Sequence, residues 1–204
     1  MFTYQTTPLE DWIESLYKQL RIHHPYELDM ELIAERLDIW LYFEEMSSRA
    51  LDRNGMYSMI IDRRLTPAEQ WQDFGHETCH LLRQAGNQFL LNHSMVELQE
   101  TRADSFAYHF CIPTFMLLYT SLPTSRNEAI TLVTETFNVT PEFAQERLIR
   151  FEKQLLTSQL TNQLAATIEA QKKIKRSIGC EYTIQTANST MLFCRERGVI
   201  GYLK

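Results

Sequence analysis

A capped amphipathic helix near the middle of the chain is the strongest constraint on its fold. The stretch 66–86 opens with TPAE, in which Thr66 can cap a helix, Pro67 suits the first helical position and Glu69 completes a capping box. Gly86 is a typical stop signal. A rotation of about 100° per residue gathers the apolar side chains into one stripe that should pack on the core. The stripe consists of Trp71, Phe74, Thr78, Leu81, Leu82 and Ala85.

Two histidines of this helix, in the sequence HETCH, lie nearly opposite the apolar stripe. His76 and His80 are one turn apart and about 40° from each other around the helix axis, so their imidazoles can converge on one metal ion. Glu77 lies on the flank of the pair, where its carboxylate could hold a metal-bound water without binding the metal. The alternative is a pair of ordinary surface histidines. A third ligand decides between the two interpretations.

A second helix is expected to follow, and it carries two candidate acids. Its start is marked by a capping box, SMVE at 94–97, and Pro113 ends it. Within it, the sequence ETRADSFAYHF begins twenty residues after His80. Glu100 and Asp104 lie on one flank of this helix, one turn apart.

If the two helices cross, Glu100 can complete a His-His-Glu zinc site and leave the fourth position for water. Asp104 would then accept the free ring N–H of a ligating histidine, expected to be His76, and fix its tautomer. Glu97, one turn earlier, is the alternative third ligand. Without the HExxH motif, Glu100 and Asp104 would simply be a solvated acidic face.

The segments before this helix pair predict an α+β fold. Residues 8–21 and 29–37 have the apolar periodicity of amphipathic helices. The stretches 39–45 (IWLYFEE) and 56–62 (MYSMIID) are rich in strand formers and are separated by a polar stretch that contains Gly55. We expect them to be neighbouring antiparallel strands of a small sheet.

The remainder of the chain is expected to be mostly helical. A capping box, SRNE at 125–128, starts a helix that reaches about Phe137. After a tight break at 138–140, a long helix should extend to about residue 170. In the tail, EYTIQT and TMLFC predict a strand pair joined at Ala187-Asn188.

The helices on either side of the break at 138–140 resemble a helix-turn-helix. DNA binding would require basic side chains on the second helix. That helix carries both signs of charge, on Glu142, Glu146, Arg147, Arg150 and Glu152. Together with the net charge of −6, this mixed face argues against nucleic-acid binding and favours structural support or substrate docking. The basic run 172–176 is expected to be a solvated helix end or, alternatively, a docking patch for an acidic partner.

The sequence predicts a cytoplasmic protein that does not contact a membrane. Its first residues lack the basic start and apolar run of a secretion signal. The longest apolar stretch, around FCIPTFMLLY, is too short to cross a bilayer. The cysteines form no CxxC pair, which favours reduced thiols. They are Cys79, Cys111, Cys180 and Cys194.

HETCH followed by ETRADSFAYHFCIP resembles the ImmA/IrrE family of zinc metallopeptidases, whose pattern is HExxH, then ExxA(N/D)xFA, then a proline. The resemblance covers roughly residues 10–155, and residues 129–151 are similar to the helical region that follows the catalytic part in this family. The chain departs from the family at Thr78 and Cys79, where Leu-Gly is usual, which puts only local packing in doubt. The matching residues are His76, Glu77, His80, Glu100, Ala103, Asp104, Phe106, Ala107 and Pro113.

The resemblance implies a zincin-like metallopeptidase domain of the α+β class at 1–120. We expect it to be followed by a helical, helix-turn-helix-like extension at 121–170 and a small C-terminal element at 171–204. Zn²⁺ held by His76, His80 and Glu100 would polarise the scissile carbonyl and lower the pKa of its bound water. Glu77 would act as the general base.

The family also implies a substrate: a helix-turn-helix transcriptional repressor of a phage or mobile element, whose cleavage derepresses genes. A rival interpretation is a stoichiometric antirepressor on the same fold, without significant turnover. A third is a DNA-binding regulator that acts through residues 126–151.

An oxyanion-stabilising donor is also required, and the sequence offers several candidates. They are His93 in the loop between the two ligand helices, Tyr108, His109, and Tyr57 on the preceding strand. For Tyr108 and His109 the alternative is helix packing or a wet surface. If the strand with Tyr57 is the edge of the sheet, it could also bind substrate by strand addition.

Overall fold

The computed structural model describes residues 4–83, 93–177, 182–186 and 188–203. The chain divides into two compact units, of which the first is Thr6–Lys153. No helix in the described part of the chain combines the length and the apolar character needed to span a bilayer.

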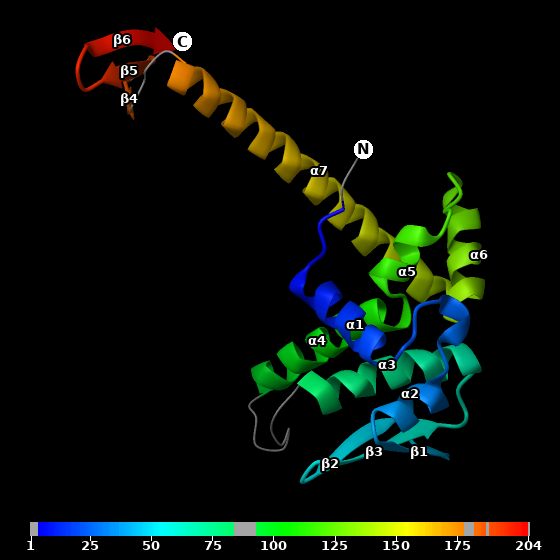
Figure 1. The fold of residues 1–204 in the computed structure, drawn as a ribbon. Helices are drawn as coiled ribbons and strands as arrows, with labels where there is room; N and C mark the ends of the chain where they lie inside the picture. Colours follow the sequence, from blue (N-terminus) through cyan, green and yellow to red (C-terminus); the bar gives the residue numbers. More distant parts are fainter. Residues whose placement is uncertain (1–3, 84–92, 178–181, 187, 204) are drawn as a thin grey trace. The chain divides into compact units, whose positions relative to one another are not determined.

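The first unit is mostly helical with one three-stranded sheet, which makes it an α+β fold as predicted (Figure 1). Its elements are α1 (Pro8–Gln19), a 3-10 turn η1 (Pro25–Glu27), α2 (Met30–Arg36), β1 (Ile39–Glu44), β2 (Arg49–Arg53), β3 (Met56–Asp62), α3 (Pro67–Arg83), α4 (His93–Cys111), α5 (Thr114–Tyr119), α6 (Arg126–Phe137) and the first part of α7 (Pro141–Ser177).

The sheet has the order β1-β3-β2, and it corrects the predicted pairing. β1 and β3 are neighbours, but they run parallel, whereas β2 is antiparallel to β3. The reason is that the polar stretch between the two predicted strands contains β2. Asn54 and Gly55 adopt left-handed backbone angles, with φ of 57° and 86°, and turn β2 back into β3. The sheet is therefore mixed, and Tyr57 lies on its central strand instead of its edge.

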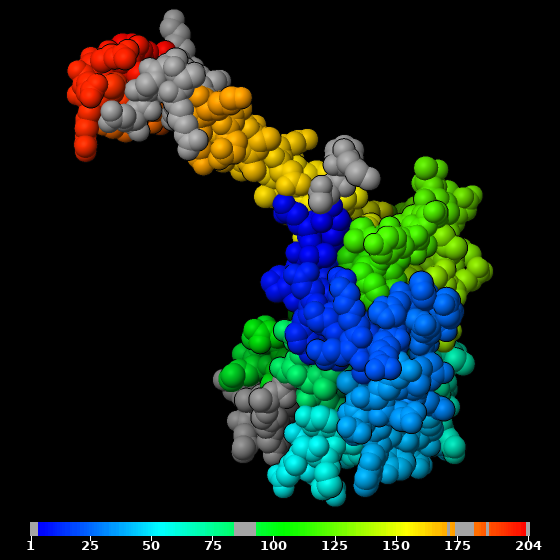
Figure 2. All heavy atoms as spheres, in the orientation of Figure 1, coloured from blue at the N-terminus to red at the C-terminus, as the bar shows by residue number. Residues whose placement is uncertain are grey.

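α2 and α3 cover one face of this sheet (Figure 1). Side chains alternate between the two faces of a strand. Ile39, Met59 and Ile61 are accordingly buried, whereas Trp40 and Tyr42 are exposed. The space-filling view shows the segment with η1 and α2, in lighter blue, forming a continuous surface with α1, in dark blue (Figure 2). α3 packs against β2 and β3 of this sheet.

The start of α3 has the predicted capping box. The Thr66 backbone N–H donates to Glu69 Oε2 at 2.8 Å, and the Glu69 N–H donates to Thr66 Oγ1 at 3.4 Å. Most of the predicted apolar stripe is buried, although Leu82 is half-buried. The predicted stop at Gly86, and Ala85 of the stripe, lie outside the described residues. α4 begins at His93, so the box predicted at Ser94 falls inside its first turn.

α3 and α4 approach each other closely at Gly75. A Cβ on this residue would lie 2.7 Å from Cys111 Sγ and 3.3 Å from Phe110 Cδ1. Glycine therefore allows the two helices to approach each other one residue before His76. Around this point Phe74, Phe106 and Phe110 are fully buried and form the core of the helix pair.

A buried polar contact joins α1 to α5 and α7. Glu10 completes the capping box of α1 by accepting the Thr7 N–H at 2.7 Å, and it also accepts Thr114 Oγ1 at 2.5 Å. Arg147 of α7 is fully buried, donates to Thr114 Oγ1 at 2.6 Å and to Ile112 O at 3.1 Å, and lies 3.9 Å from the Glu10 carboxylate. Arg147 thus belongs to the core and not to a mixed surface face.

The predicted break between α6 and α7 is confirmed. Asn138 ends α6 in the left-handed conformation, with φ of 50°, and α7 begins at Pro141. Ser125 precedes α6 but makes no side-chain capping bond, so this capping box does not form. α7 continues to Ser177, which is further than the predicted end at about residue 170.

The second unit joins Gln154–Lys204 to Met1–Gln5. The Gln5 backbone N–H donates to Ser158 Oγ at 3.0 Å on α7. The predicted strand pair is confirmed as β4 (Tyr182–Gln185) and β5 (Thr190–Cys194), which are antiparallel. A third strand, β6 (Gly198–Leu203), pairs with β5 and was not predicted.

The close approach at Gly75 gives a test of the helix packing. An alanine in a helix is normally about 1 kcal/mol more favourable than a glycine. In Gly75→Ala, overpacking of about 1–3 kcal/mol should cancel or reverse that gain. Removing the Sγ atom with Cys111→Ala should make the same change at Gly75 less unfavourable by about 1 kcal/mol. Urea unfolding of the four proteins of this cycle measures the coupling; additive effects would contradict the packing described.

Candidate metal centre

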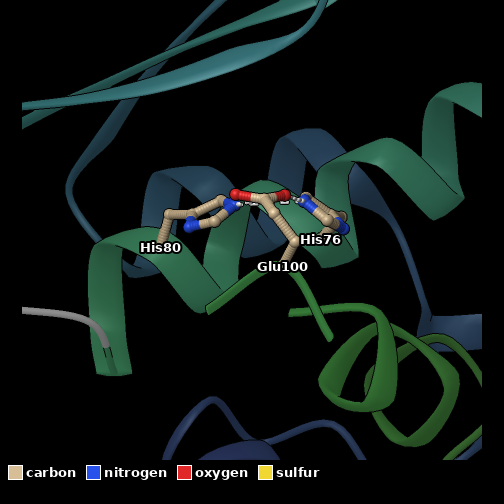
Figure 3. Close-up of side chains that lie close together, drawn as sticks. All are labelled: His76, His80 and Glu100. Carbon is tan, nitrogen blue, oxygen red and sulfur yellow. Dashed lines mark hydrogen bonds and ion pairs between the residues drawn. The ribbon is translucent and has the colours of Figure 1, made fainter. Parts of the chain in front are cut away.

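His76 and His80 on α3 and Glu100 on α4 converge at one point (Figure 3). His76 Nε2 lies 3.2 Å from Glu100 Oε2 and 3.0 Å from His80 Nε2. His80 Nε2 lies 3.8 Å from the same carboxylate oxygen. The histidine side chains are 23% and 15% exposed, whereas that of Glu100 is 45% exposed. The cluster is therefore accessible from the α4 side.

These three residues have the chemistry and spacing of a zinc site. Two imidazole nitrogens and one carboxylate oxygen are the donors found in His-His-Glu centres. Ligand atoms about 2.0–2.1 Å from a tetrahedral ion are about 3.4 Å apart, and the three measured separations, 3.0, 3.2 and 3.8 Å, bracket that value. Among the residues that the structure describes, this is the one cluster of three such side chains close enough to hold an ion.

Asp104 lies one turn beyond Glu100 and orients the first histidine. Its Oδ1 is 3.0 Å from His76 Nδ1. A carboxylate can only accept, so Nδ1 carries the proton, and the lone pair of Nε2 points toward His80 and Glu100. This is the arrangement by which an outer carboxylate holds a metal-ligating imidazole in the required tautomer.

Glu77 is half-buried between α3 and the sheet. Its Oε2 accepts the Ala50 backbone N–H of β2 at 2.7 Å. Burial raises the pKa of the Glu77 carboxyl, while the neighbouring His80 and His76 and the Ala50 hydrogen bond oppose that shift. The Ala50 contact could not be predicted from the sequence, because it uses a backbone N–H that every residue except proline has.

The structure places the alternative third ligand away from the cluster. Glu97 Oε1 pairs with His93 Nδ1 at 3.4 Å on the surface of α4. His93 is the first residue of α4 and not part of a loop, and its side chain is 88% exposed. The helix continues further toward its N-terminus than the capping box indicated.

Two other oxyanion candidates have packing contacts. The Tyr108 ring lies 4.4 Å from that of Phe143, and the Arg150 guanidinium lies 4.6 Å from its centroid. His109 Nδ1 donates to Ser105 O at 2.8 Å, and burial lowers its pKa to about 4. Tyr57 is half-buried on β3, where it is paired with Asp52 of β2.

The sequence matches known proteins over most of its length. Residues 34–149 match the family model Peptidase_M78, described as the IrrE N-terminal-like domain. The phage-like element PBSX protein XkdA of Bacillus subtilis is 41% identical over 185 residues, which cover 91% of this chain and 93% of XkdA. The protein YqaB of the same organism is 41% identical over 152 residues, which cover 74% of this chain and 88% of YqaB.

Among solved structures, a transcriptional regulator of Mycobacterium tuberculosis matches with a TM-score of 0.49 at 15% identity. The match covers 68% of this chain and 46% of the regulator, so this chain spans less than half of that protein's length.

Metal content tests the cluster directly. We expect the purified protein to bind about one zinc ion per chain and His80→Ala to lose it, because two remaining ligands hold the ion too weakly. His93→Ala is the matched control, since it removes an exposed histidine outside the cluster, and it should keep full zinc content. Equal zinc content in all three proteins by elemental analysis would exclude the site.

Asp104 gives a second, graded test. Asp104→Asn should keep the fold but weaken zinc affinity about 10–100-fold, since an amide holds the His76 N–H less well than a carboxylate. Competition with a fluorescent chelator measures the affinity. Glu97→Gln, on the same helix, should leave it unchanged; an equal loss there would point to a general effect of surface charge.

Proposed function

The chain belongs to the ImmA/IrrE family, whose peptidase domain it contains, and from this premise we propose that it is a zinc-dependent endopeptidase that cleaves a helix-turn-helix repressor. The relatives support a phage-related role of the metallopeptidase type. The observation that carries the finer proposal is the convergence of His76, His80 and Glu100 beside the half-buried Glu77.

The proposed chemistry divides among residues of the two ligand helices. Zinc bound by His76, His80 and Glu100 would supply the Lewis acid that polarises the scissile carbonyl. Glu77 removes the proton from the attacking water and delivers it to the leaving amine. Because Oε2 of Glu77 accepts the Ala50 N–H, its Oε1 is the oxygen assigned to this transfer.

Edge strand β2 is the proposed docking site for the substrate backbone. It is the strand whose Ala50 contacts Glu77, and one of its sides is not paired within the sheet. An extended peptide can add to such an edge by main-chain hydrogen bonds. Substrate binding by strand addition is therefore proposed for β2 and not for β3, which carries Tyr57 and is the central strand.

A repressor substrate fits a phage context, which is supported by the relative XkdA, a protein of the phage-like element PBSX. Its cleavage would remove the DNA-bound form and derepress the genes it controls. Because repressors act on the chromosome, we propose that the protein works in the cytoplasm.

DNA binding by α6 and α7 has less support. The first half of α7 carries acidic Glu142, Glu146 and Glu152 beside its basic residues, and Arg147 is buried in the core. Acidic side chains repel the phosphate backbone on which nucleic-acid affinity depends. The α6–α7 pair is proposed to support the domain or dock the substrate.

Glu77→Gln separates cleavage from stoichiometric antirepression. The amide cannot accept the proton, so cleavage of a purified helix-turn-helix phage repressor should fall at least about 100-fold while zinc content stays unchanged. Mass spectrometry of the fragments and a reporter gene under that repressor provide the two measurements. Glu97→Gln, the same change on an exposed carboxylate, should behave as the unmodified protein. Derepression by Glu77→Gln with zinc still bound would favour the antirepressor.

A further inference from the structure

Two carboxylates of α3 hold two residues at the start of β2. Ser48 Oγ donates to Asp73 Oδ2 at 2.5 Å, and Ala50 N donates to Glu77 Oε2 at 2.7 Å. Asp73 and Glu77 are one turn apart, about 6 Å along the helix, and residues 48 and 50 are about 6.6 Å apart along an extended chain. The spacing of the two acceptors therefore matches that of the two donors, and the strand is held in register along the helix.

Ser48 also receives a hydrogen bond from the sheet. The Asp62 backbone N–H at the end of β3 donates to Ser48 Oγ at 3.0 Å. The Asp62 carboxylate is occupied in turn by the Arg64 side chain, which donates to it at 2.8 and 2.5 Å. Because the Asp73 carboxylate can only accept, the Ser48 hydroxyl accepts from Asp62 and donates to Asp73. It joins the beginning of β2, the end of β3 and α3 through one atom.

The hydrogen bonds of Ser48 can affect the reaction because Ala50, two residues later, contacts Glu77. Among the residues that the structure describes, β2 pairs with β3 alone, which makes it an edge strand of the sheet. Its contact with α3 through Ser48 limits how far the Ala50 N–H can move relative to Glu77. The Ala50 N–H in turn fixes one oxygen of Glu77, and the orientation of a general base is decisive for proton transfer.

We propose that Ser48 and Asp73 are a positioning pair that keeps edge strand β2 in register with α3 and so orients the Glu77 carboxylate. The proposal rests on the proposed function for the role of Glu77, but the register of β2 does not depend on it. Neither residue touches the reacting atoms. Both act through the Ala50 backbone.

The test uses the full-length chain and begins with a measurement that needs no substrate. Ser48→Ala removes the hydroxyl donor, and Asp73→Ala removes the carboxylate acceptor, so each breaks the contact from a different side. Hydrogen exchange of the Ala50 amide, followed by NMR, should become about tenfold faster in both variants. Ser48→Thr keeps a hydroxyl and should exchange slowly. Ser47→Ala, the same change on the neighbouring exposed serine, is the matched control and should have no effect.

The second measurement is cleavage of the same phage repressor by the zinc-loaded proteins. In Ser48→Ala and Asp73→Ala, kcat should fall about tenfold with little change in KM and with full zinc content, because a misplaced base slows the chemical step. Ser48→Thr should recover most of the loss. Measuring the zinc content of each variant shows whether the substitution has also disturbed the zinc ligands.

Each outcome has one meaning. Unchanged exchange of the Ala50 amide in both variants overturns the proposal, and so does faster exchange with an unchanged kcat. If the unmodified chain cleaves no repressor, the proposed function fails, while the exchange rates still decide whether Ser48 and Asp73 hold β2 in register.

Discussion

The close contact between α3 and α4 is the constraint on which the candidate site depends. The three candidate ligands come from two helices, so the distances between them depend on how closely these helices approach. At Gly75 there is no side chain between the helices, and Cys111 and Phe110 fill the space that a Cβ would take. If the two helices moved apart, Glu100 would move away from both imidazoles even though none of the three ligands had been substituted. The geometry of the candidate metal site therefore depends on the packing of the core.

The features that follow from local periodicity were predictable from the sequence. The helical repeat placed His76 and His80 on one side of α3, and the repeat of α4 placed Glu100 and Asp104 on one flank; the structure describes both arrangements. Features that depend on backbone groups were not predictable. The Ala50 N–H that binds Glu77 has no side-chain signal. The parallel pairing of β1 with β3 could be predicted only if β2 was recognised as a strand between them in the sequence.

The C-terminal part shows a different limit. β4 and β5 were recognised because they are rich in strand-forming residues, whereas β6 contains Gly198 and Gly201, which have low strand propensity. Gly201 lies opposite Leu192 of β5, whose Cδ1 would be 3.7 Å from an added Cβ. Pairing with an existing strand therefore stabilises a segment that its own composition does not favour.

The contact between Glu10 and the buried Arg147 has a consequence for how this domain can be delimited. The family match begins at residue 34, after α1. Glu10 of α1 nevertheless provides the carboxylate that lies 3.9 Å from the buried guanidinium of Arg147 on α7. A fragment trimmed to the matched segment would lose that acid and leave a guanidinium in the core, at a cost on the order of 3–5 kcal/mol. The compact unit Thr6–Lys153 is thus larger than the segment matched by the family model, and α1 is part of its core.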